Sequence, residues 1–108
     1  MGRKWEDFID GIKDQTGSLA KGELKNLVTW ARTEQEAFIK KQAVDLERYL
    51  TELANAEITK KQFEGYMRDM KRLTRLQALQ MSVAGKAAAQ RLVEGIQKLI
   101  IDGLLALI

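Results

Sequence analysis

The sequence contains no cysteine, no proline and no histidine among its 108 residues. Without cysteine there is neither a disulfide framework nor a thiolate metal site. Without histidine the chain lacks the side chain best suited to acid or base catalysis near neutral pH. It also has no glycine-rich phosphate loop and no Glu-x-x-His pattern of a di-iron bundle. We therefore expect no enzyme, no catalytic residues, no metal and no cofactor.

The absence of proline leaves nothing to forbid very long helices. Hydrophobic residues make up 45% of the chain and charged residues 31%, a mixture that can form a core and is not typical of disorder. The length suits one small domain. We therefore expect a single helical domain over residues 1–108.

The N-terminal part of the chain has the apolar spacing of a short amphipathic helix over about residues 3–14. Trp5, Phe8, Ile9 and Ile12 fall on one face of such a helix. The following stretch, 15–18, breaks it, and Ser18 is a suitable N-cap for a second helix.

Two long helices are expected after that break. The second, about residues 18–55, has an eleven-residue repeat that aligns Leu27, Phe38 and Tyr49 and suits a nearly straight helix. Thr59 and Gln62 form the pattern of a capping box, which begins a third helix over about 60–107. Helices joined by a short turn fold back on each other. The sequence therefore predicts an all-α fold with a long antiparallel hairpin, which assembles into an oligomeric helical bundle.

The end of the chain, "GIQKLIIDGLLALI", is its most apolar segment. On a helical wheel its polar residues leave an apolar arc of roughly 220°, which is more than one neighbouring helix can cover. Apolar surface left exposed on this scale usually marks an interface. We expect the surface to be covered by copies of the same chain, by membrane lipid or by another helical protein. The residues expected at this oligomer or membrane interface are Leu92, Ile96, Leu99, Ile100, Leu104, Leu105 and Ile108.

Small residues recur along the same predicted helix, and small side chains let helices approach closely. They serve either a contact between subunits or the packing of Trp30, which the hairpin register sets opposite Ala84. The residues expected in close helix packing are Ala84, Gly85, Ala88, Gly95 and Gly103.

Four basic residues, Arg68, Lys71, Arg72 and Arg75, have the spacing of one helical face. One interpretation is an anion-binding face for phosphate or a charged membrane. The favoured interpretation is a solvated face that pairs with Asp45 and Glu47 across the hairpin. No aromatic residues interleave with the arginines and no nucleic-acid-binding motif occurs, so nucleic acid is not expected as a partner.

Two functional hypotheses follow. The first is a structural or interaction protein that self-assembles into a homo-oligomer through its apolar C-terminal helix. The alternative is a membrane-associated or pore-forming helical protein that uses the same surface. The acidic residues Glu6, Asp7 and Asp10 occur where a signal peptide would have its apolar stretch. No run reaches the ~18 apolar residues of a membrane span, so we expect a cytoplasmic protein, with membrane association as the alternative.

Overall fold

The regular structure of this chain is helical throughout the described residues, which are 2, 4–14, 17 and 19–108 of a computed structural model. This confirms the all-α class. The elements are α1 (Trp5–Gly11), α2 (Lys21–Thr33), α3 (Ala37–Ala54), α4 (Lys60–Ala78), α5 (Val83–Gly95) and the π-helix η1 (Ile96–Leu104).

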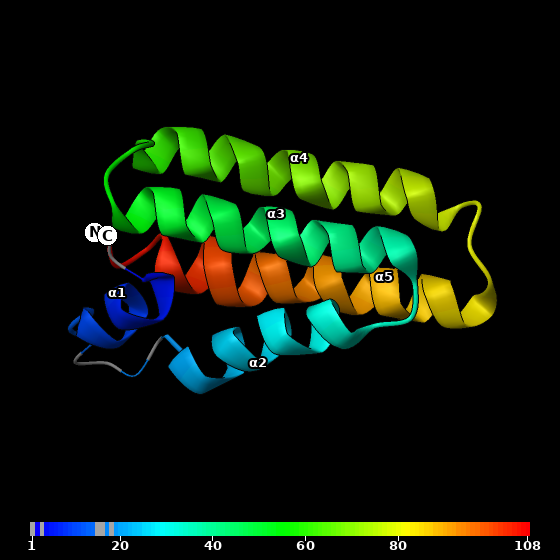
Figure 1. Ribbon diagram of the computed structural model, residues 1–108, viewed down its shortest axis with the longest axis horizontal. Coiled ribbons are helices and arrows are strands. Elements are labelled where there is room, and N and C mark those ends of the chain that lie inside the picture. Colours follow the sequence, from blue (N-terminus) through cyan, green and yellow to red (C-terminus); the bar gives the residue numbers. More distant parts are fainter. Residues whose placement is uncertain (1, 3, 15–16, 18) are drawn as a thin grey trace.

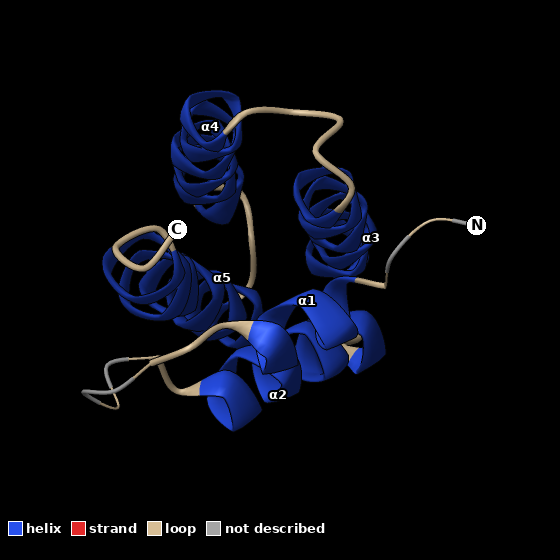
Figure 2. Ribbon diagram, turned by 90° about the vertical axis from the view of Figure 1, so that its left-hand side faces the viewer, coloured by secondary structure: helices blue, strands red, loops and turns tan. Residues whose placement is uncertain are grey.

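The helices α2 to α5 run alternately up and down and surround one core (Figures 1 and 2). η1 continues α5 toward the C-terminus without a break (Figure 1). A π-helix has bonds from an amide to the carbonyl five residues earlier, and at the end of η1 Leu105 N bonds in this way to Ile100 O at 2.9 Å. The short α1 packs against α2 and α3 at the end of the bundle where the C-terminus lies (Figure 1).

The predicted turn between the second and third predicted helices is formed between α3 and α4. Thr59 is the N-cap of α4, and its side chain and that of Gln62 bond reciprocally to the backbone as a capping box, which confirms the prediction. Beyond this turn α3 and α4 lie side by side. The rings of Tyr49 and Tyr66 stack at 4.6 Å between them.

The predicted helix over 18–55 is not continuous, because the chain leaves the helical conformation at residues 34–36. Glu34 and Glu36 have extended backbone, with ψ of 143° and 115°. Local polar bonds close the end of α2, among them Thr33 Oγ1 to the Trp30 carbonyl at 2.9 Å. α2 begins after Ala20, whereas the expected cap Ser18 lies outside the described residues.

The predicted helix over 60–107 is also divided, at residues 79–82. Ser82 has extended backbone and its hydroxyl accepts from Gly85 N at 3.1 Å, so it caps a new helix. The two breaks turn the expected two-helix hairpin into four shorter helices that can pack around a common core.

This arrangement places the apolar C-terminal segment inside the molecule. Ile96, Ile100 and Leu104 each have 0% exposure, and η1 packs against α2 and α4. Lys60 Nζ donates to the Ile108 carbonyl at 2.7 Å, which holds the end of the segment beside the start of α4. The expectation that this segment needs other chains or lipid to cover it is therefore corrected, since the chain's own helices supply the neighbours.

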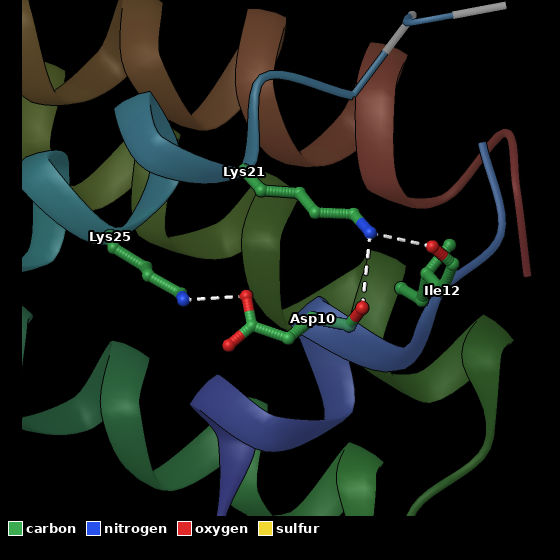
Figure 3. Close-up of polar contacts among 4 residues, drawn as sticks. All are labelled: Asp10, Ile12, Lys21 and Lys25. Carbon is green, nitrogen blue, oxygen red and sulfur yellow. Dashed lines mark hydrogen bonds and ion pairs between the residues drawn. The ribbon is translucent and has the colours of Figure 1, made fainter. Parts of the chain in front are cut away.

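The helix α1 is held by its buried residues Trp5 and Ile9 and by two lysines of α2 (Figure 3). Lys21 Nζ donates to the carbonyls of Asp10 at 3.1 Å and Ile12 at 2.6 Å. Lys25 Nζ lies 2.6 Å from the Asp10 carboxylate. A cation at a helix C-terminus satisfies free carbonyls and complements the helix dipole.

Candidate interaction surface

The predicted interface residues do not form a surface. Leu92, Ile96, Ile100, Leu104 and Leu105 are buried in the chain's own core, with at most 3% exposure. Leu99 and Ile108 are half-buried and pack against the same core. In this fold the seven do not form the wide apolar face that the helical wheel predicted, because they pack in or against the chain's own core.

Four of the five predicted small residues pack within the chain. Gly85 and Ala88 are buried, as is Gly103, while Ala84 is exposed. An added Cβ on the half-buried Gly95 would lie 2.6 Å from a terminal carbon of Leu27. Trp30 is half-buried and lies under Arg91, whose guanidinium carbon is 4.2 Å from the ring centroid.

The four basic residues on α4 have different surroundings rather than one shared role. Lys71 is buried at 9% exposure, and its ammonium donates to Gln97 Oε1. Arg68 pairs with Glu64 at 3.6 Å and Arg72 with Asp69 at 2.8 Å, both on the same helix. Pairing across to α3 is not formed, because Asp45 lies near Arg48 and Glu47 near Arg32 instead.

Arg75 differs from the other three, because it lines a groove between α4 and α5. The groove has a volume of about 280 Å³, and Lys86, Gln90 and Glu94 line it together with Ala78, Ala89 and Val93. Gln90 Nε2 donates to Glu94 Oε1 at 3.1 Å, so the single acid of the groove has a partner. Arg75 and Lys86 form no ion pair within the described part of the chain.

Next to this groove lies a cluster of exposed apolar side chains that the sequence analysis missed. We call it the apolar tip, and it consists of Leu73, Leu76, Leu79 and Val83. Their exposed fractions are 51%, 56%, 76% and 87%, rising toward the α4–α5 connection. This connection projects past the α2–α3 connection at the same end of the bundle (Figure 1). Four of the five large apolar side chains exposed among the described residues thus lie in the last turns of α4, the connection and the first residue of α5.

The periodicity of α4 contained a signal for this tip. Phe63, Met67 and Met70 define the buried stripe. At 100° per residue, Leu76 falls about 150° from the centre of that stripe. A leucine opposite the core stripe is exposed unless another element covers it, and no other helix covers that face of α4 in the views of Figures 1 and 2.

A second groove of about 450 Å³ lies along the junction of α2 with α5 and η1, and its charges, on Glu23, Arg91, Glu94 and Lys98, are of both signs. No helix in the described ranges has both the length and the apolar character required to cross a bilayer. Nor do the acidic side chains there gather into a group that could hold a metal ion.

The fold and surface define a small all-α bundle with one exposed apolar tip beside unpaired cations. The chain matches no protein family model, no curated protein and no solved structure. The function must therefore be argued from the surface itself.

Proposed function

We propose that this chain is a non-catalytic interaction protein that docks on an anionic lipid surface through its apolar tip. The observation that supports this is the gathering of Leu73, Leu76, Leu79 and Val83 at one projecting end of the bundle. Contiguous exposed apolar side chains on a small protein are favoured where a binding partner removes them from water. A projecting tip, unlike a groove, suits a broad partner such as a bilayer.

The charges around the tip favour a negative surface. Residues 68–86 carry five basic side chains and one acidic side chain. Each Lys or Arg close to an anionic membrane contributes about 1 kcal/mol, and full burial of a leucine contributes about 1.5–3 kcal/mol. A few leucines and cations acting together therefore account for reversible attachment, which neither set gives alone.

The acidic turn of α2–α3 sets the direction of approach. Glu36 lies beside α5, since an added Cβ on Gly85 would be 3.1 Å from its carboxylate oxygen. Anionic lipid repels this corner, while the tip projects beyond it (Figure 1). The bundle is therefore expected to contact the surface with its α4 side first.

Co-sedimentation with vesicles tests this proposal. Vesicles of zwitterionic lipid alone are compared with vesicles that also contain anionic lipid, at low and high salt. We expect binding only to the anionic vesicles, weakened by salt. The double variant Leu76→Ser/Leu79→Ser should bind at least about tenfold more weakly. Val44→Ser is the control, because Val44 is 63% exposed on α3, away from the tip.

Light scattering without lipid distinguishes the earlier hypothesis of self-assembly. A full-length protein that fails to bind either vesicle, and that forms an oligomer which Leu76→Ser/Leu79→Ser dissociates, would make the tip a contact between copies of the chain. That result would overturn the lipid proposal.

A further inference from the structure

We propose that the groove between α4 and α5 binds a phosphate group, with Arg75 and Lys86 as its cations. The lipid source of that phosphate rests on the proposed function, but the groove itself does not. Both side chains line the same 280 Å³ space, and neither has an ion-pair partner among the described residues. Two cations that line one groove without ion-pair partners repel each other, and an anion between them relieves that repulsion.

The other basic residues of the predicted face of α4 already have partners among the described residues, unlike Arg75. Arg68 and Arg72 already have carboxylate partners on the same helix. Lys71 is buried and bonded to Gln97. The charge still available to an external anion is therefore concentrated at Arg75 on α4 and Lys86 on α5.

The chemistry of the lining favours phosphate over a larger polyanion. A guanidinium offers paired donors that match the oxygens of phosphate, and an ammonium adds a point charge. The volume is below that of most drug-sized ligand sites, so it suits one such group. Glu94 is part of the lining, and its charge repels an anion that would extend along the groove.

The groove also lies beside the apolar tip, where a lipid headgroup could reach it. Arg75 directly precedes Leu76, and Lys86 follows Val83 by three residues. A phosphate held between Arg75 and Lys86 would lie next to the side chains that enter the lipid interface. An anionic headgroup with an exposed phosphate is therefore the ligand class that both features fit.

The experiment compares two kinds of vesicle with matched surface potential. In one the added anionic lipid is phosphatidic acid, and in the other it is oleate, which has a carboxylate. The test variant is Arg75→Gln/Lys86→Gln. The control is Lys61→Gln/Arg68→Gln, which removes the same charge from exposed positions of α4 outside the groove. Amide chemical shifts with inorganic phosphate provide a readout without lipid.

We expect wild type and the control variant to bind the phosphatidic acid vesicles about tenfold more tightly than the oleate vesicles, and the test variant to lose this preference. We also expect phosphate to shift the amides around Arg75 and Lys86, and to do so in Leu76→Ser/Leu79→Ser as well. Shifts with inorganic phosphate but no vesicle binding would support the groove with free phosphate as its ligand, and would overturn the proposed function. Equal loss of binding in the two charge variants, with no preference for phosphatidic acid, would overturn the groove and leave the lipid-docking function standing.

Discussion

A buried polar pair lies in the seam between α3 and α4. Gln42 and Thr74 are 4% and 0% exposed. Gln42 Nε2 donates to Thr74 Oγ1 at 3.2 Å, and the threonine hydroxyl donates to the Met70 carbonyl at 2.7 Å. Removing one partner of a buried pair costs more than removing both, because the remaining group stays desolvated without a bond.

This pair gives a prediction with an internal control. Thr74→Val keeps the shape but deprives the Gln42 amide of its acceptor, so it should lower the free energy of unfolding by about 1–3 kcal/mol. Adding Gln42→Leu removes the stranded amide and should restore part of the loss. Urea unfolding of both single variants and the double variant measures this. Strictly additive effects would contradict the coupling.

Substitution by alanine should have opposite effects on the free energy of unfolding at two helical glycines. Gly65 on α4 has open space where a Cβ would lie, so Gly65→Ala should stabilise the protein by about 1 kcal/mol. At Gly95 the new Cβ would lie 2.6 and 2.7 Å from the terminal carbons of Leu27, which is itself only 5% exposed. Overpacking costs about 1–3 kcal/mol and offsets the helical gain. Thermal unfolding should separate the two variants, and equal stabilisation would mean that Leu27 relaxes freely.

At the scale of the element, the end of α3 has the backbone of a Schellman motif. Ala56 N bonds to Leu53 O at 3.1 Å and Glu57 N to Glu52 O at 2.8 Å. The motif places Ala56 at φ 56°, a left-handed conformation that costs a residue with a Cβ roughly 1–2 kcal/mol. We therefore expect Ala56→Gly to raise the free energy of unfolding, by up to about 1 kcal/mol after the entropy of glycine in the unfolded chain is counted. Chemical denaturation measures the change, and a loss of stability would contradict it.

A side chain that forms the cap is the signal by which the sequence marks a helix end, although the cap at Ser82 was not predicted. Thr59 and Gln62 predict the start of α4, because both hydrogen bonds of the capping box involve their side chains. The N-caps of α2 and α3, Ala20 and Glu36, make no such bond, so no residue pattern marked them. The break before α3 instead follows from tertiary packing, which allows α2 and α3 to lie against each other. Such an effect overrides local propensity.

The candidate site was missed for a related reason. The spacing of Arg68, Lys71, Arg72 and Arg75 alone predicted one basic face. Spacing places side chains around a helix, but it does not say which other helices surround it. Lys71 became buried because α4 packs against η1, and Lys86 joined Arg75 only because the chain turns back at residues 79–82.

On the scale of the whole molecule, the placement of the C-terminal segment depended on how many neighbours the chain could provide. In the predicted hairpin of two long helices, the C-terminal turns would extend beyond the second helix, and other chains would be needed to cover them. With four helices, α2 and α4 both contact η1, and the segment becomes core. The wide apolar arc was read correctly as a surface that requires more than one neighbour. The error was the assumption that those neighbours are intermolecular.

A pair of leucines makes this difference measurable. Leu104 is 0% exposed and Leu79 is 76% exposed. Leu104→Ala should lower the free energy of unfolding by about 2–5 kcal/mol, as deletions in a packed core do. Leu79→Ala should change it by less than about 0.5 kcal/mol. Denaturant unfolding followed by circular dichroism measures both. Similar small effects would place the C-terminal segment outside the core.

Removal of residues 95–108 extends this test to the whole fold. The deletion takes Ile96, Ile100 and Leu104 out of the core and uncovers the faces of α2 and α4 that they fill. Because a domain of this size has a small margin of stability, the remaining chain should lose its cooperative thermal transition. If the segment instead served only to join separate copies, the shortened chain would stay helical, melt cooperatively and scatter light as a smaller species. That outcome would restore the segment as an assembly surface and would contradict the packing described above.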